Sequence, residues 1–138
     1  MARPQAGLER FRRRAHAQGL SGMPVLELVT IGHKSREERT ILITYVDDGG
    51  APALIGSNAG RDADPAWVKN LRAEPAARAR WGGAWRDVTA VELAGEARQR
   101  VWDAAVATTP GYVRYLDTMT RPIPIMRLEP TDRTWSRG

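Results

Sequence analysis

The chain has no cysteine, and only two histidines and one phenylalanine occur among its 138 residues. Without cysteine it forms neither disulfides nor thiolate metal sites, which fits a reducing compartment. His16 and His33 are too few and too far apart to indicate a zinc or iron site, so we expect no bound metal. We find neither an apolar run long enough to span a membrane nor a hydrophobic signal segment. The sequence therefore predicts a soluble, cytoplasmic protein.

Acidic residues are outnumbered by basic ones, 16 against 21, and most of the excess lies near one end. Residues 1–14 hold five arginines and one glutamate, which is five minus one, or +4 of the chain's net +5. A nucleic-acid binder usually spreads its basic residues over a folded groove, so we expect no nucleic-acid partner. Residues 1–22 are interpreted as a basic arm or helix. Contact with an anionic membrane through Leu8, Phe11 and the arginines is one hypothesis for this arm, and simple solvation is the other.

Apolar and β-branched runs between turn residues predict six strands, at 25–31, 39–46, 51–57, 76–81, 85–93 and 123–128. Glycine-rich pairs at 49–50 and 82–83 predict hairpin turns, and the first three strands are interpreted as one meander. Asp64 is predicted to cap a helix that ends at Glu74, and a second helix is predicted over 96–107. The two prolines at 122 and 124 predict that the last strand lies at an edge or bend. These patterns favour an α+β, mainly β domain over 23–130, followed by a tail at 131–138.

A charged loop follows the first predicted strand. It reads Gly-His-Lys-Ser at 32–35 and continues to Arg39 across two glutamates. Two cations, a histidine and a hydroxyl on a turn are the groups that bind a phosphate. Glu37 and Glu38 offset part of that charge, so an ordinary solvated loop is the alternative interpretation.

A second polar segment, Ser-Asn-Ala-Gly at 57–60, leads into the helix that carries Trp67 and Asn70. Residues three apart lie on one face of a helix, so the amide of Asn70 lies beside the indole of Trp67. By itself Trp67 fits an ordinary core residue, whereas a buried amide needs a hydrogen-bond partner.

Taken in this order, the segments resemble the deazaflavin-dependent nitroreductase family of the flavin/deazaflavin split β-barrel superfamily. The family's loop reads Gly-Arg-Lys-Ser-Gly-x-x-Arg. Lys34, Ser35 and Arg39 correspond directly, while His33 replaces the first Arg and Arg36 replaces the second Gly. Three further segments are similar to the family's Ser-x-x-Gly, Pro-x-Trp-x-x-Asn-Leu and Arg-x-Ile-Pro motifs, at 57–60, 65–71 and 121–124.

The resemblance implies a split β-barrel, similar to the FMN-binding split barrels, with about six antiparallel strands and peripheral helices. It also implies that the loop cations hold the phosphate and polyglutamate tail of coenzyme F-420, an 8-hydroxy-5-deazaflavin. FMN, which related split barrels use, is the alternative cofactor. The implied cofactor-binding residues are His33, Lys34, Ser35, Arg39, Thr40, Ile41, Leu42, Ile43, Thr44, Ile55, Gly56, Ser57, Asn58, Ala66, Trp67, Val68, Lys69, Asn70 and Tyr112.

Two tyrosines, Tyr112 and Tyr115, lie three residues apart on a short predicted helix. Their spacing alone indicates an amphipathic rim. In the resembled family, tyrosines in this segment wall the substrate pocket, so the resemblance implies that both contact the acceptor.

The implied activity is hydride transfer from reduced coenzyme F-420 to an electron-poor small molecule, such as a quinone, an enone or a nitroaromatic. A non-catalytic lipid or cofactor carrier of the same fold is one alternative, and an FMN-dependent reductase is another. The oligomeric state is open between a monomer and a homodimer.

Overall fold

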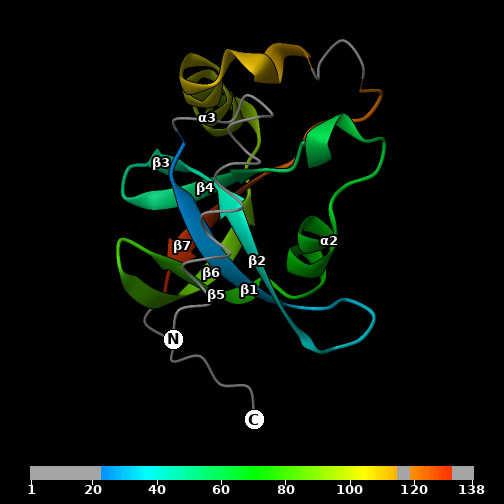
Figure 1. The fold of residues 1–138 in the computed structure, drawn as a ribbon, viewed down its shortest axis with the longest axis vertical. Helices are drawn as coiled ribbons and strands as arrows, with labels where there is room; N and C mark the ends of the chain where they lie inside the picture. The colour runs from blue at the N-terminus through cyan, green and yellow to red at the C-terminus, as the bar shows by residue number, and fades with distance from the viewer. Residues whose placement is uncertain (1–22, 115–118, 132–138) are drawn as a thin grey trace.

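The computed structural model describes residues 23–114 and 119–131, which form one curled antiparallel sheet with two α-helices (Figure 1). The seven strands follow the order β2-β1-β5-β6-β7-β4-β3 across the sheet. The strands are β1 (Val25–Ile31), β2 (Glu38–Thr44), β3 (Val46–Asp48), β4 (Ala51–Ile55), β5 (Ala76–Trp81), β6 (Ala84–Glu92) and β7 (Ile125–Pro130). The helices are α2 (Ala66–Ala73) and α3 (Gly95–Thr108), with short 3-10 turns η1 (Asn58–Gly60) and η2 (Pro110–Tyr112). This half-barrel confirms the predicted fold class, with one strand more than expected. The basic arm lies outside the described residues, as do positions 132–138 of the predicted tail.

The concave side of the sheet is apolar because successive side chains of each strand point to opposite faces, and the apolar ones share this face. On β1, Leu26 and Leu28 are at most 1% exposed, while their neighbours along the strand are half-buried. Helix α2 places Val68 and Leu71 on this side, where they meet apolar side chains from β4, β5, β6 and β7. The cluster fixes α2 against the end of β1, which is where the charged loop begins.

A second cluster lies on the other side of β4 and β7, under α3. Every residue of β4 is buried, since Leu54 faces the first cluster while Ala53 and Ile55 face Val101 and Trp102 of α3. A strand covered on both sides has a continuous apolar sequence rather than an alternating one.

Three local expectations are wrong. The first three predicted strands do not form a continuous meander, because the second one divides at Tyr45. Its first part, β2, pairs with β1, and its second part, β3, pairs with β4 across the predicted turn at Gly49 and Gly50. Strand β7 is interior, between β6 and β4, and Pro122 and Pro124 precede it. Asp64 does not cap α2; its carboxylate pairs instead with Arg72 at 2.7 Å and Arg121 at 2.6 Å.

The β5–β6 hairpin has the predicted turn. Gly82 and Gly83 have φ angles of 60° and 80°, which glycine adopts without the steric cost that other residues have. Within the described part of the chain, no helix has both the length and the apolar character needed to cross a bilayer.

Candidate functional site

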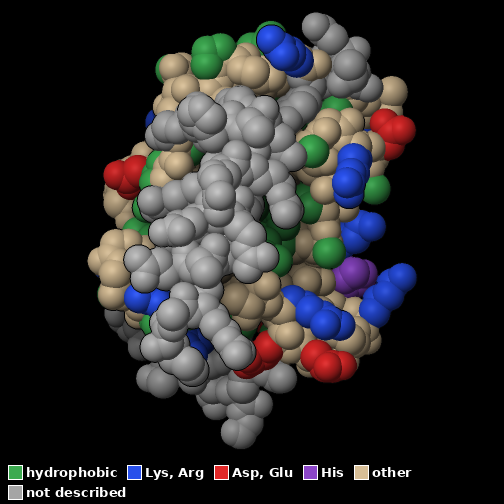
Figure 2. All heavy atoms as spheres, in the orientation of Figure 1, with side chains coloured by type: hydrophobic (Ala, Val, Ile, Leu, Met, Phe, Trp, Pro, Cys, Tyr) green, Lys and Arg blue, Asp and Glu red, His purple; other side chains and the backbone are tan. Residues whose placement is uncertain are grey.

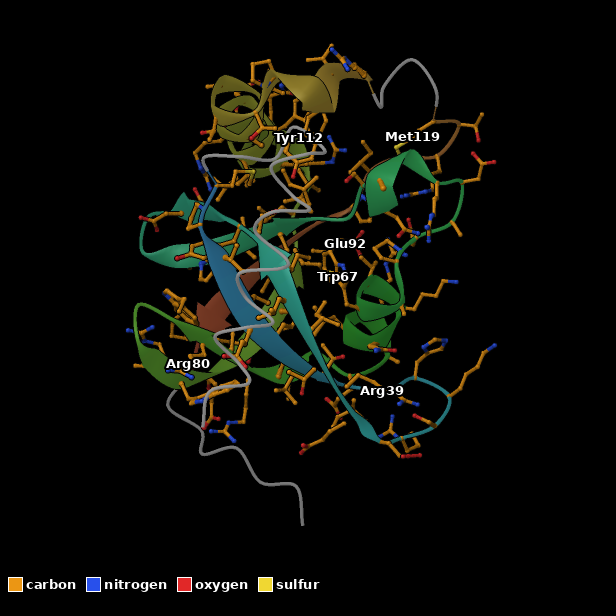
Figure 3. All side chains as sticks on the ribbon, in the orientation of Figure 1. Arg39, Trp67, Arg80, Glu92, Tyr112 and Met119 are labelled. Carbon is orange, nitrogen blue, oxygen red and sulfur yellow. The ribbon has the colours of Figure 1, made fainter. Side chains whose placement is uncertain are left out.

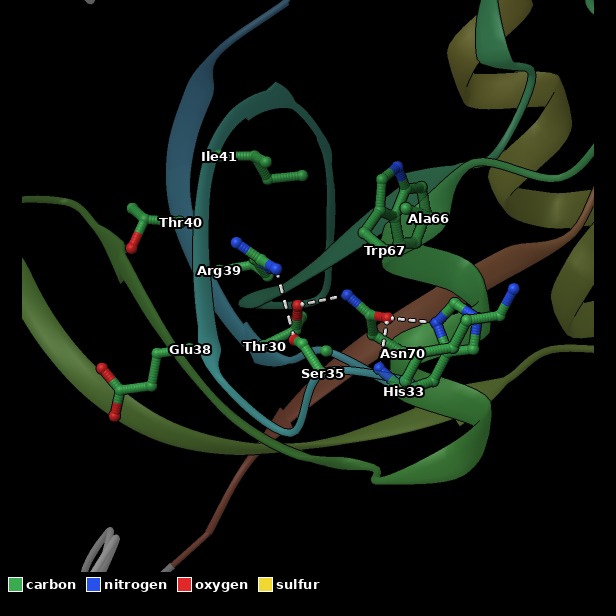
Figure 4. A pocket seen from close by; sticks show the side chains of 12 residues that line it. Thr30, His33, Ser35, Glu38, Arg39, Thr40, Ile41, Ala66, Trp67 and Asn70 are labelled. Atoms are coloured by element: carbon green, nitrogen blue, oxygen red, sulfur yellow. Dashed lines mark hydrogen bonds between the residues drawn. The ribbon is translucent and has the colours of Figure 1, made fainter.

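A groove of about 650 Å³ opens between the end of β1, the charged loop, the start of β2 and the first turns of α2 (Figure 4). Its size falls in the range typical of small-molecule and cofactor sites, about 300–1,000 Å³. The groove is lined by Thr30, Gly32, His33, Lys34, Ser35, Glu38, Arg39, Thr40, Ile41, Ala66, Trp67 and Asn70.

The charged loop is closed by its own backbone. The Gly32 N–H donates to the Glu37 carbonyl at 2.8 Å, and the Arg36 N–H donates to the Gly32 carbonyl at 2.9 Å. Inside this turn the Ser35 hydroxyl accepts from the Glu37 N–H at 3.2 Å and from Arg39 Nη2 at 3.3 Å. A Cβ at Gly32 would collide with the Ser35 hydroxyl. Glycine at position 32 therefore leaves room for the Ser35 hydroxyl, which contacts the Arg39 guanidinium.

Asn70 joins the loop to helix α2. Its Oδ1 accepts from the His33 backbone N–H at 2.9 Å and lies 2.7 Å from His33 Nδ1. Its Nδ2 donates to the Thr30 hydroxyl at 3.0 Å, so one buried amide connects β1, the loop and α2 (Figure 4). The partner that a buried amide needs is supplied by the protein itself.

The walls of the groove differ in chemistry. Ile41 and Trp67 provide an apolar wall, while Lys34 and Arg39 provide positive charge along the loop side. Glu38 is the one carboxylate among the described lining residues. Figure 2 shows basic side chains gathered around His33 on this face. A site with this arrangement binds a ligand that has a flat apolar part and an anionic part.

Helix α2 is anchored on its far side by an ion-pair cluster. The Arg72 guanidinium donates to both carboxylate oxygens of Glu92, at 2.9 and 2.8 Å, and to Asp64 at 2.7 Å. Hydrogen bonding to this guanidinium holds the pKa of Glu92 below its usual range. The cluster connects the helix to β6, which supports the wall carrying Trp67.

The structure brings nine of the predicted cofactor residues together around the groove, and their roles stay predictions. These nine are His33, Lys34, Ser35, Arg39, Thr40, Ile41, Ala66, Trp67 and Asn70.

Five predicted residues on β2 and α2 do not line the groove. Leu42 and Thr44 lie further along β2 from the loop, where they pair with Glu27 and Val25 of β1, and Ile43 packs against the first core cluster. Val68 is fully buried in that cluster. Lys69 is exposed on α2 outside the lining set.

The predicted residues at the end of β4 form a separate turn. Ile55 packs under α3, and a Cβ on Gly56 would lie 2.8 Å from the Pro124 ring. The Asn58 amide donates to the carbonyl of Ala63 at 2.9 Å, and Ser57 is 8% exposed. None of these four residues lines the groove.

Arg121 holds that turn in place, a role that the sequence interpretation missed. It donates to the carbonyls of Gly56 and Ser57 at 3.2 and 3.1 Å and pairs with Asp64. Arg121 belongs to the Arg-x-Ile-Pro segment, so the motif identified the residue but did not indicate what it contacts.

Tyr112 lies apart from the groove. It is 3% exposed, its ring is 5.8 Å from that of Trp102, and its hydroxyl lies 3.8 Å from the sulfur of Met23. In Figure 3 it is at the α3 end of the molecule, whereas Arg39 is at the other end. Tyr115 lies outside the described residues, so the acceptor-side role of both tyrosines stays a prediction.

Three lining residues were not predicted: Thr30, Gly32 and Glu38. Thr30 had a detectable signal, since it follows Leu26 and Leu28 on the inward side of β1 and is a polar residue at a core position. Among the described residues no group of three or more histidines and carboxylates is placed to hold a metal ion.

The architecture is that of a split β-barrel, and solved structures of the same class match it. A solved structure described as an F420-H2 dependent reductase, FDR-A, is 33% identical and has a TM-score of 0.70, covering 77% of this chain and 94% of that one. A second structure, described as a domain-swapped dimer, is 29% identical with a TM-score of 0.70, covering 91% of this chain and 99% of that one.

The family model for F420H2-dependent quinone reductases matches residues 3–130, and the chain belongs to this family. An F420H2-dependent quinone reductase of Mycobacterium tuberculosis is 32% identical over 108 residues, which cover 76% of this chain and 72% of the relative. The predicted family resemblance and oxidoreductase class are confirmed, and coenzyme F-420 is the cofactor that the family uses.

Proposed function

We propose that the groove beside α2 binds coenzyme F-420 and that the protein uses its reduced form to reduce a quinone. The observation that carries this proposal is one groove with an apolar wall at Trp67 and Ile41 and the cations Lys34 and Arg39 on its loop side. A deazaflavin ring with a phosphorylated, carboxylate-rich tail has the complementary character. The residues present therefore fit the cofactor.

Each side of the groove has its own task. Lys34 and Arg39 offset the charge of the phosphate and glutamates, and the Ser35 hydroxyl keeps the Arg39 guanidinium at the loop. Trp67, 8% exposed, keeps water from one side of the ring. Asn70 holds the loop and the helix at a constant separation, so that tail and ring are bound together.

When bound, the reduced coenzyme supplies two electrons and a proton as hydride, and a quinone that accepts the hydride and one further proton becomes a hydroquinone. The protein's own contribution is binding, orientation and the exclusion of water from the reacting face. We place the quinone at this site because the family model is that of quinone reductases.

The cofactor assignment is tested by substituting the loop cations. Lys34→Ala and Arg39→Ala should each weaken binding of coenzyme F-420 about tenfold to a hundredfold, since a charge-assisted hydrogen bond contributes about 1.5–3 kcal/mol. Fluorescence quenching of the deazaflavin gives the dissociation constant. Arg80→Ala is the matched control, because Arg80 pairs with Glu27 at 3.5 Å outside the groove and its side chain is 45% exposed (Figure 3).

Equal affinity of the wild type and both loop variants would contradict the assignment. Tighter binding of FMN than of coenzyme F-420 in the same titration would identify the alternative cofactor. Turnover of a quinone panel with reduced coenzyme then tests the acceptor.

We further infer that the chain pairs with a second copy, as supported by the domain-swapped dimer that is 29% identical to it. Sedimentation equilibrium should give about twice the chain mass of 15.3 kDa. The monomer mass at every concentration would exclude pairing.

A further inference from the structure

The orientation of the Asn70 amide is determined by chemistry. The His33 backbone N–H points at this amide at 2.9 Å, and a backbone N–H is only a donor. The facing amide atom is therefore the oxygen, because the flipped amide would place two donors against each other. The amide nitrogen then faces the Thr30 hydroxyl at 3.0 Å, where it has an acceptor.

The same oxygen also determines where the His33 ring carries its proton. It lies 2.7 Å from Nδ1, and since a carbonyl oxygen only accepts, Nδ1 must carry hydrogen. In the neutral ring this leaves Nε2 with a lone pair and no hydrogen. Only the imidazolium form has a donor at both nitrogens.

We propose that His33 couples binding of the anionic part of the cofactor to the uptake of a proton. This inference rests on the proposed function, because it assumes that coenzyme F-420 occupies the groove that His33 lines. Phosphate and carboxylate oxygens accept hydrogen bonds, and a neutral ring held in the Nδ1–H form offers them only a lone pair. Protonation of Nε2 gives the ring both a positive charge and a second donor. Changing to the other neutral tautomer would break the contact with Asn70.

The charged groups that line the groove with His33 come from the loop and from the start of β2. Lys34 and Arg39 add positive charge to the groove and Glu38 adds negative charge, while α2 contributes the neutral Asn70 and Trp67. The exposed loop residues 36 and 37 have opposite charges. Side chains of the Lys, Arg and Glu types keep constant charge between about pH 6 and 8, and histidine is the type that changes there. The resembled loop has arginine at this position, which stays charged throughout.

The test is calorimetric titration with coenzyme F-420 at pH 6 and pH 8, comparing the wild type with His33→Arg. From pH 6 to pH 8 the dissociation constant of the wild type should rise, because the neutral ring binds the anion less well. This rise should be about threefold to tenfold larger than the rise for His33→Arg. The variant keeps the charge and removes the titration, so ionisation of the coenzyme itself affects both proteins equally. Repeating the titration in two buffers of different ionisation enthalpy measures proton uptake directly in the unmodified protein.

Larger proton uptake by the wild type than by His33→Arg supports the coupling. Identical pH profiles and identical proton uptake would overturn it while leaving the cofactor assignment intact. Absence of binding by both proteins at either pH would overturn the cofactor assignment and this inference together. His33 is half-buried in a surface loop, so the fold of the variant is checked by thermal unfolding.

Discussion

Arg121 makes polar contacts with four residues that lie at least 57 positions away in the chain. Its side chain is 13% exposed and pairs with Asp64 at 2.6 Å. It also donates to the backbone carbonyls of Gly56, Ser57 and Arg61, at 3.2, 3.1 and 3.1 Å. Arg121→Ala removes the side-chain donor from all three carbonyls, although the Ser57 carbonyl still accepts from the Gly60 N–H at 2.9 Å. It also removes one of the two cations that neutralise Asp64.

The expected loss of stability follows from these contacts. A hydrogen bond from a charged donor contributes about 1.5–3 kcal/mol, but contributions within one network do not add. Asp64 also keeps its pair with Arg72 at 2.7 Å, and water can reach part of the site. We therefore expect about 2–3 kcal/mol. For 138 residues the unfolding entropy is about 0.29 kcal/mol/K, so the melting temperature should fall by about 7–10 °C.

Differential scanning calorimetry measures this change, with Arg61→Ala as the matched control. Arg61 lies in the same turn and its side chain is exposed. Only its backbone carbonyl accepts from Arg121, so removing the side chain keeps that hydrogen bond. The control should shift the melting temperature by less than about 2 °C. Arg121→Lys should lie between the two, since lysine keeps the charge without the planar fork of donors. Equal shifts for Arg121→Ala and Arg61→Ala would refute the proposed role.

Three further predictions concern stability. Arg36 has a φ of 63°, so Arg36→Gly should stabilise the fold by about 0.5–1 kcal/mol in urea unfolding. Hydrogen bonding to Arg100 is the largest effect that holds the pKa of Asp48 below its usual value. Ionised Asp48 therefore stabilises the fold above about pH 4, and this stability is lost as the pH falls through the lowered pKa. Asp48→Asn should be less stable at pH 7 and lose less stability on acidification. Gly56→Ala should cost about 1–3 kcal/mol, because the new Cβ would lie 2.8 Å from the Pro124 ring.

Each of these variants has a matched control. Glu37→Gly lacks a left-handed φ to relieve and should destabilise the fold, so a similar gain in both loop variants would contradict the strain argument. Asp47→Asn removes a negative charge from the same turn and keeps an acceptor for the Gly50 N–H. An equal change in the acid profile of both variants would argue against the Arg100 contact as its cause. Gly111→Ala meets no atom within 4 Å, and a loss there equal to that of Gly56→Ala would argue against the collision.

Local features of the fold were predictable from sequence. The bounds of β1 and β5 agree with the predicted 25–31 and 76–81, and the β5–β6 turn lies at the predicted glycine pair. Strand alternation and positive φ at glycine depend on residues within a few positions of each other, so the sequence contains the information directly. The motif order also located the loop and helix that form the groove, through the family resemblance.

Contacts between distant residues were decided by the tertiary structure. Strand β4 pairs with β7, about seventy residues later, because curling the sheet brings those two apolar strands together between the two core clusters. Asp64 looked like a helix cap, but the same curling places Arg121 beside it.

In the groove, too, residue types were predictable from sequence, whereas contacts between distant residues were not. The residue types in the loop left a phosphate site and a solvated loop open, and the family resemblance favoured the phosphate site. That Asn70 binds His33, 37 positions away, rather than a ligand follows only from the packing of α2 against the end of β1. A hydrogen bond depends on the positions of both partners in space, and the curled sheet with its packed helix α2 determines those positions.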